Sequence, residues 1–95
     1  MERVTRDIRL TLIGKPGCHL CDDARVVVQS VMAEIEATDA ASRMSLEEQS
    51  ILDDADLAAR YAEEIPVVLV DGIQRDFWKI DEARLERVLQ RAMAQ

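Results

Sequence analysis

Apolar and polar residues alternate from Ile8 to Ile13, and this alternation predicts a β-strand. The strand is expected to end at Gly14-Lys-Pro-Gly17, a cluster of turn-forming residues. From Leu20 onward the apolar residues recur at helical spacing, which predicts an amphipathic helix with Cys18 at or near its N-cap. The apolar stripe of this helix consists of Leu20, Ala24, Val27, Val28, Val31, Met32 and Ile35.

The middle of the chain has a weaker pattern of apolar residues. Thr38 to Arg43 is small and polar and predicts a loop. Residues 45–52 alternate only weakly, and we predict an edge strand there. The carboxylates of Asp53 to Asp56 are suited to capping a helix, so we predict a short helix that continues through Tyr61.

The last third of the chain predicts a β-hairpin and a final helix. Residues 65–70 form a nearly continuous apolar strand, and Asp71-Gly72 is a typical hairpin turn before a second strand at 73–77. Asp81 is suited to the N-cap of a helix with an apolar stripe. That stripe consists of Leu85, Val88, Leu89, Ala92 and Met93.

Together these elements predict one α/β domain over residues 1–95, with an ordered core at about 8–94. Their order is β-α-β-α-β-β-α. A β-α-β connection joins parallel strands, so the first two strands are expected to be parallel and the hairpin strands antiparallel. We expect a mixed four-stranded sheet flanked by three helices, with helices on both faces.

The charge of the chain narrows the classes of function. It has 12 Lys and Arg residues against 19 Asp and Glu residues, a net charge of -7, and its basic residues are scattered. We therefore expect no binding to nucleic acid or to an anionic membrane. The segment 1–7 is charged, and no apolar run of about 18 residues occurs. We accordingly expect a cytoplasmic protein, and we expect it to be a monomer.

Cys18 and Cys21 are the only cysteines, and their C-x-x-C spacing at a strand-to-helix junction indicates redox chemistry. Unpaired N–H groups and peptide dipoles at a helix N-terminus stabilise a thiolate, and they lower a cysteine pKa from ~8.5 to roughly 3.5–7.5. Cys18 is expected to be the exposed attacking thiol. Cys21, one turn further on, is expected to be shielded and to resolve the mixed disulfide. The alternative is a pair of buried small hydrophobic residues.

Neighbouring charged residues bear on the reactivity of Cys18. Lys15 is either an ordinary loop lysine or a cation that stabilises the thiolate. His19 is either a solvated residue of the first turn or a group that, when protonated, favours the thiolate. Asp22 and Asp23 suit the helix dipole but oppose a nearby thiolate, so we predict a moderately lowered pKa for Cys18.

Two runs of residues carry a family resemblance: Leu12-Ile-Gly-Lys-Pro-Gly-Cys-His-Leu-Cys-Asp-Asp-Ala24 and Glu64-Ile-Pro-Val-Val-Leu-Val-Asp-Gly72. With the element order, they make the chain resemble the thioredoxin superfamily and, within it, the small bacterial glutaredoxin-like proteins. The resemblance covers about residues 8–94. It implies a thioredoxin-like fold of the glutaredoxin type.

The resemblance also implies roles for single residues. Cys18 would be the nucleophile, Cys21 the resolving thiol, and Lys15 a residue that stabilises the thiolate and meets a glutathione carboxylate. Pro66 would be the cis-proline beside the thiols. A cis Ile65-Pro66 bond would turn the backbone of Ile65 outward, so that its N–H and C=O can pair with an extended substrate chain.

The chain departs from the glutaredoxin pattern at positions that concern glutathione. His19-Leu20 lies between the cysteines where typical glutaredoxins have Pro-Tyr or a similar pair, and Glu64-Ile65 precedes the proline where they have Thr-Val. Phe77-Trp-Lys-Ile-Asp81 stands in place of a Gly-Gly-x-Asp-Asp-like segment. Phe77 and Trp78 are either packing residues or, for Trp78, part of a substrate groove.

The sequence predicts an enzyme, a dithiol-disulfide oxidoreductase of the glutaredoxin or thioredoxin type, with a redox-active disulfide that transfers electrons. Its expected partners are a protein disulfide or a glutathionylated protein as substrate and glutathione or a reductase as electron donor. We expect no tightly bound cofactor and no metal, with glutathione as a candidate co-substrate. Two alternatives stay open: metal or iron-sulfur binding through the cysteine pair in a dimer, and a non-catalytic peptide-binding module.

Overall fold

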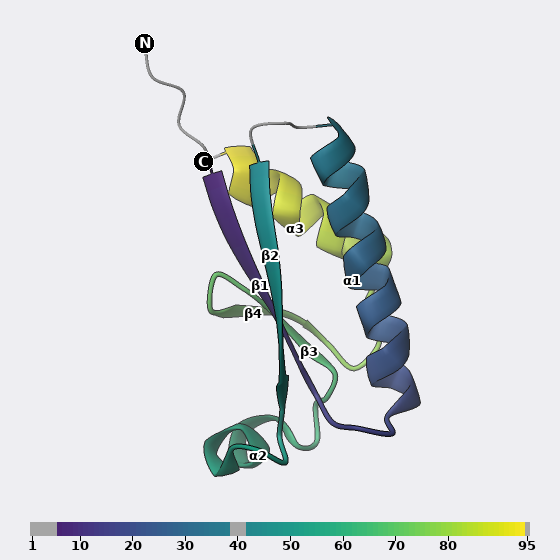
Figure 1. Ribbon diagram of the computed structural model, residues 1–95, viewed down its shortest axis with the longest axis vertical. Coiled ribbons are helices and arrows are strands. Elements are labelled where there is room, and N and C mark those ends of the chain that lie inside the picture. Colours follow the sequence, from purple (N-terminus) through teal and green to yellow (C-terminus); the bar gives the residue numbers. More distant parts are fainter. Residues whose placement is uncertain (1–5, 39–41, 95) are drawn as a thin grey trace.

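The computed structural model describes residues 6–38 and 42–94, and the elements follow one another in the predicted order (Figure 1). They form a four-stranded mixed sheet with three helices, so the predicted fold class is confirmed. The elements are β1 (Arg6–Gly14), α1 (His19–Thr38), β2 (Ser42–Ser50), α2 (Ala55–Tyr61), β3 (Val67–Val70), β4 (Ile73–Phe77) and α3 (Glu82–Ala94).

The strand order in the sheet is β2-β1-β3-β4. β1 pairs parallel with β2 and antiparallel with β3, and β3 pairs antiparallel with β4. Asp71 and Gly72 join β3 to β4 with φ angles of 51° and 84°, the conformation that a tight two-residue hairpin requires. The parallel first pair, the hairpin and the edge position of β2 are therefore all confirmed.

Several boundaries differ from the prediction. Thr38 ends α1, and Arg43 already belongs to β2, so the predicted loop 38–43 is shorter. Residues 39–41 of that loop lie outside the described residues. β2 begins early because it pairs along the whole of β1, from Arg6 opposite Ser42 to Gly14 opposite Ser50. Pairing to a neighbouring strand thus overrides the weak local pattern of this segment.

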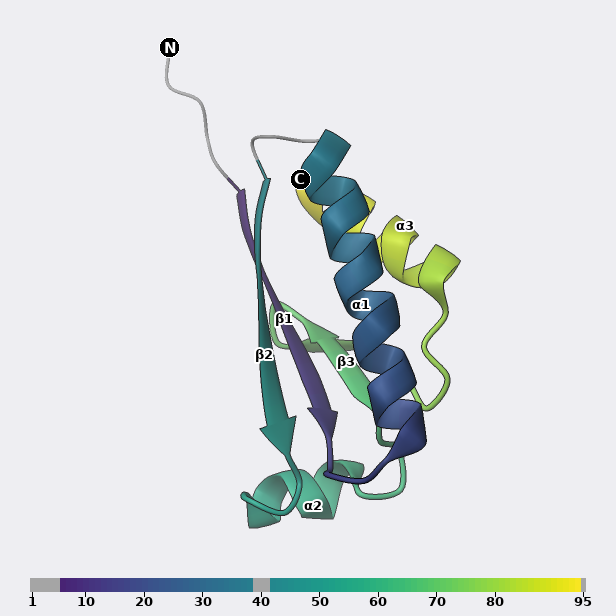
Figure 2. The same cartoon turned by 45° about the vertical axis from the view of Figure 1, so that its right-hand side comes forward.

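α1 and α3 cover one face of the sheet (Figure 2). Alternate residues of β1 point toward these helices, as the predicted alternation requires. Burying each large apolar side chain of this cluster contributes about 1.5–3 kcal/mol to stability. The buried cluster consists of Ile8, Leu10, Leu12, Ala24, Val28, Val31, Ile35, Val68, Val70, Leu85 and Leu89.

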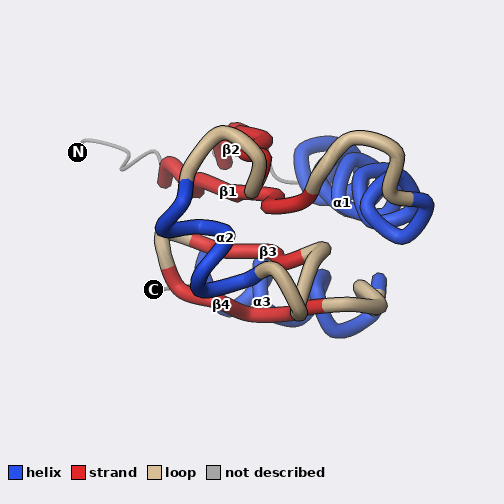
Figure 3. The backbone as a smooth tube through the Cα atoms, turned by 90° about the horizontal axis from the view of Figure 1, so that it is seen from below, coloured by secondary structure: helices blue, strands red, loops and turns tan. Residues whose placement is uncertain are grey.

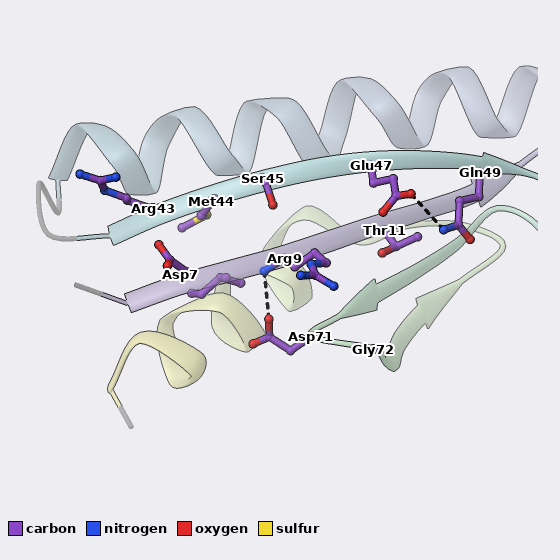
Figure 4. Close-up of a pocket in the computed structure, with 11 residues that line it drawn as sticks. Asp7, Arg9, Thr11, Arg43, Met44, Ser45, Glu47, Gln49, Asp71 and Gly72 are labelled. Atoms are coloured by element: carbon purple, nitrogen blue, oxygen red, sulfur yellow. Dashed lines mark hydrogen bonds between the residues drawn. The ribbon is translucent and has the colours of Figure 1, made fainter. Parts of the chain in front are cut away.

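α2 lies over one end of the sheet (Figure 3). It covers only that end of the opposite face, where Tyr61 forms a small buried cluster with Ile13 and Val67. Among the described residues, no helix covers the rest of this face, which forms an open, shallow groove of about 620 Å³ (Figure 4). Coverage of the second face is therefore less than predicted, because α2 has only 7 residues. The polar residues along this groove are Asp7, Arg9, Thr11, Arg43, Ser45, Glu47, Gln49 and Asp71.

Candidate active site

Cys18 lies directly before α1 and serves as its N-cap. The carbonyl of Cys18 accepts a hydrogen bond from the Asp22 N–H at 3.0 Å, and the Cys18 Sγ accepts one from the Cys21 N–H at 3.1 Å. This sulfur therefore lies at the positive end of the helix dipole and next to an N–H donor. Both effects stabilise a thiolate at Cys18, in the N-cap position that the sequence predicts.

Cys18 and Cys21 are joined by a disulfide, and their Cα atoms are 5.2 Å apart. This separation falls within the range of roughly 4.4–6.8 Å at which a disulfide forms without movement of the backbone. Cys21 is 2% exposed, whereas Cys18 is partly exposed. The relative exposure of the two sulfurs is therefore the one expected of an attacking and a resolving cysteine.

Gly14, the last residue of β1, leaves room for Cys21. A Cβ atom on Gly14 would lie 2.8 Å from the Cys21 Sγ and 3.1 Å from the Cys21 Cβ. The first distance is far inside van der Waals contact, so any larger residue would displace the sulfur. The turn cluster Gly14-Lys-Pro-Gly17 explains the glycine only as a turn former and does not predict this contact. A glycine at the end of the strand that leads into the C-x-x-C motif was the available signal.

Arg25 neutralises part of the negative charge near the cysteines. It forms an ion pair with Asp22 at 2.9 Å and a second with Glu48 of β2 at 2.8 Å. The hydrogen bond to Asp22 is the main cause of a raised pKa of Arg25, and the hydrogen bond to Glu48 is the second cause. Because of this ion pair, the carboxylate of Asp22 destabilises a thiolate at Cys18 less than its negative charge alone would. The i, i+3 spacing of Asp22 and Arg25 on one helix was the missed signal.

Lys15 and His19 are both exposed. Lys15 lines a polar pocket of about 250 Å³ together with Cys21 and Arg25, so the fold brings this lysine to the side of the cysteine pair. His19 is the first residue of α1. Their proposed effects on the thiolate remain predictions.

The Ile65-Pro66 peptide bond is cis, as the family resemblance implies. Pro66 is buried and Ile65 is half-buried. The N–H of Ile65 donates to the carbonyl of Tyr61 at 3.1 Å, as does the N–H of Glu64 at 2.8 Å. The backbone of Ile65 is thus tied to the end of α2, and its N–H is not turned toward a substrate chain as expected. The last carbonyls of a helix have no partner within the helix and need N–H donors from the following residues. This need explains why the N–H of Ile65 faces α2 and not a substrate chain.

Trp78 links the segment after β4 to the loop that contains the cis-proline. Its N–H donates to the carbonyl of Pro66 at 2.7 Å and to that of Glu64 at 3.1 Å. Its φ angle of 64° lies in the left-handed region, which a bulky residue adopts only when its surroundings hold it there. The side chain of Trp78 is 58% exposed and that of Phe77 is 50% exposed, so neither is a core residue.

Within the ranges 6–38 and 42–94, no group of three or more His, Cys, Asp or Glu residues is arranged to hold a metal ion. Over the same ranges, no helix is both long and apolar enough to cross a membrane.

A mixed four-stranded sheet, with a C-x-x-C pair at the start of α1 and a cis-proline before β3, defines a thioredoxin-fold protein with a redox-type site. Within that class, residues 9–90 match the model of the glutaredoxin-like domain family (DUF836). The chain therefore belongs to this family.

The chain is also similar to individual proteins. The uncharacterized protein Rv0508 of Mycobacterium tuberculosis is 27% identical over 86 residues, which cover 88% of this chain and 84% of that protein. The crystal structure of protein XcR50 from X. campestris is 28% identical with a TM-score of 0.68, covering 86% of this chain and 96% of that one. Chloroplastic thioredoxin z is 11% identical with a TM-score of 0.69, covering 94% and 80%, and is similar in fold alone.

Proposed function

We propose that this protein is a dithiol-disulfide oxidoreductase in which Cys18 attacks and Cys21 resolves. The observation that carries the proposal is a partly exposed N-cap cysteine with its sulfur next to a helix N–H, within disulfide-bonding distance of a buried cysteine. Such an arrangement activates one thiol and keeps the other for the second step.

The reaction begins with the dithiol form. The Cys18 thiolate attacks one sulfur of the substrate disulfide, an enzyme–substrate disulfide forms, and the other substrate sulfur leaves as a thiolate that takes up a proton. Cys21 then loses its proton and attacks the Cys18 Sγ, which releases the second substrate thiol. Two electrons pass to the substrate, and the Cys18–Cys21 disulfide is left.

The proposed substrates are protein disulfides or glutathionylated proteins. A thiol reductant must return two electrons to the Cys18–Cys21 disulfide, and we propose glutathione or a dithiol reductase for this step. The proposed setting is the reducing cytoplasm, where a C-x-x-C pair is suited to cycling rather than to a permanent bridge.

Substitution of the resolving cysteine tests the mechanism. Cys21→Ser is expected to trap a mixed disulfide with a substrate, because the second attack is lost while the first remains. Cys18→Ser, the matched control, should trap none. The trapped species is measured by mass spectrometry of the intact protein, before and after reduction.

The opposite result would overturn the proposal. Equal trapping by both variants, or no reaction of the reduced protein with small disulfides, would contradict a role for Cys18 as the nucleophile. Partner binding that persists unchanged in the double variant Cys18→Ser, Cys21→Ser, without any exchange activity, would instead support the non-catalytic module.

A further inference from the structure

An apolar groove lies beside the cysteine pair, between the first turns of α1 and the segment that joins β4 to α3. It has a volume of about 350 Å³. Leu20, one of the two residues between the cysteines, lines one side, and Trp78 and Ile80 line the other. One residue of the C-x-x-C motif therefore forms part of the groove wall. Its remaining lining residues are Asp23, Ala24, Val27, Lys79 and Asp81.

The backbone of Trp78 is held in place beside this groove. The backbone N–H of Trp78 is shared between the carbonyls of Pro66 and Glu64, and these bonds hold a left-handed backbone conformation that a tryptophan adopts at a cost. The side chain remains 58% exposed, so burial in the core does not offset that cost. A large exposed aromatic residue on a segment with a held backbone, in a groove that also contains Leu20 of the C-x-x-C motif, is typical of a surface that binds a partner.

The charges around the groove select against anions. Asp23 and Asp81 line it, against a single basic lining residue, Lys79. The start of α3, which could otherwise bind an anion, is already occupied by carboxylates of the chain: Asp76 accepts from the Asp81 N–H, and Asp81 accepts from the Ala83 N–H, both at 3.0 Å. A ligand with free carboxylates, such as glutathione, would meet like charges there.

We infer that this groove selects protein disulfides in which an apolar side chain next to the attacked cysteine lies against Trp78 and a basic residue lies near Asp23 and Asp81. Trp78 is then a specificity-determining residue. This inference rests on the proposed function and names its substrate class: extended protein segments with apolar and basic residues, in preference to glutathionylated thiols. The apolar groove favours the side chain, and the acidic lining favours the basic residue.

Peptide disulfides that differ at one position test the inference. The residue next to the cysteine is Leu or Ala in one pair of peptides, and a flanking residue is Lys or Glu in the second pair. The ratio of kcat/KM values within each pair is measured with a dithiol reductant, and a glutathione mixed disulfide is included as a further substrate. The small disulfide 2-hydroxyethyl disulfide gives the reference rate, because it cannot fill the groove.

The wild-type protein is expected to prefer Leu over Ala by about tenfold, within the range that one apolar side chain gives in a binding pocket. Trp78→Gly should abolish this preference, and it should fold because glycine adopts a positive φ without strain. Trp78→Phe should keep most of the preference. Phe77→Ala is the matched control, because Phe77 is also exposed, to 50% against 58% for Trp78, but does not line the groove.

The charge preference is tested in the same assay. Wild-type protein should act faster on the Lys peptide than on the Glu peptide and the glutathione mixed disulfide, and Asp23→Lys should reduce or reverse the preference for the Lys peptide. Equal kcat/KM values for all peptides, or equal effects of Trp78→Gly and Phe77→Ala, would overturn the inference. If the reference disulfide is reduced normally in that case, the proposed function stands; if it is not reduced at all, the proposed function fails as well.

Discussion

At the scale of single residues, the site depends on how two sulfurs are placed rather than on a large set of catalytic groups. The N-cap position of Cys18 gives its sulfur the N–H of Cys21 as a donor, and Arg25 compensates the carboxylate of Asp22 one turn away. Gly14 allows Cys21 to pack against the end of β1. The resolving step is therefore expected to be sensitive to the volume of residue 14.

Gly14→Ala should slow the attack of Cys21 on a mixed disulfide by about tenfold or more, because the added methyl group displaces the Cys21 sulfur. It should also lower the free energy of unfolding by about 1–3 kcal/mol, the usual cost of an overpacked site. Stopped-flow measurement of mixed-disulfide formation and decay separates the two chemical steps.

The control for Gly14→Ala uses protein that lacks the resolving thiol. In the Cys21→Ser background, Gly14→Ala should leave the first attack by Cys18 unchanged. If the first attack slows as much as the second, Gly14 affects the whole site and does not specifically position Cys21.

At the scale of elements, Asp76 of β4 holds the segment that carries Trp78. Its side chain is 3% exposed, and its Oδ1 accepts from the Phe77 N–H at 2.9 Å and from Arg84 at 3.2 Å. Its Oδ2 accepts from the Asp81 N–H at 3.0 Å. One buried carboxylate thus connects β4 to the start of α3.

Asp76→Asn should lower the free energy of unfolding by about 1–3 kcal/mol, because one carboxylate oxygen becomes an NH₂ group that faces another donor. Urea denaturation measures the change. Asp71→Asn is the matched control: Asp71 is exposed, and its carboxylate accepts a hydrogen bond from the Arg9 N–H that an amide oxygen can also accept. The control substitution should lower the free energy of unfolding by about 0.5 kcal/mol or less. If Asp76→Asn lowers it by no more than the control does, the role of Asp76 is contradicted.

The predicted elements show where local patterns suffice. β1, the Asp71-Gly72 hairpin and α1 were predictable because each follows from a period of two or 3.6 residues or from the needs of a tight turn. The early start of β2 was not, because its polar residues are stabilised by pairing with β1 and by an edge position rather than by their own pattern.

At the scale of the whole molecule, the two faces of the sheet differ. α1 and α3 bury one face, whereas the other is covered by α2 only near the cysteines and is polar along Arg9 and Glu47 (Figure 4). Stability should therefore come mainly from the first face.

Leu10→Ala should lower the free energy of unfolding by about 2–5 kcal/mol, because Leu10 is fully buried under the helices. Arg9→Ala and Glu47→Ala, on the open face, should each change it by about 0.5 kcal/mol or less. Urea denaturation at several protein concentrations provides the measurement. Comparable losses on both faces, especially if they depend on concentration, would mean that a second molecule covers the open face.

The sequence by itself determined the order of the elements, the core-facing side of β1, the hairpin turn and the N-cap position of Cys18. These features depend on interactions between residues that are near one another in the chain, so periodicity and turn chemistry are enough to specify them. The tertiary structure alone decided the contact of Gly14 with Cys21 and the position of Trp78 beside Pro66. It also decided that the N–H of Ile65, which was expected to pair with a substrate chain, donates to the carbonyl of Tyr61. Each of these depends on how separate segments pack against one another. Only for Gly14 did the sequence offer a signal, a glycine between the strand and the C-x-x-C motif, and that signal does not name the contact with Cys21.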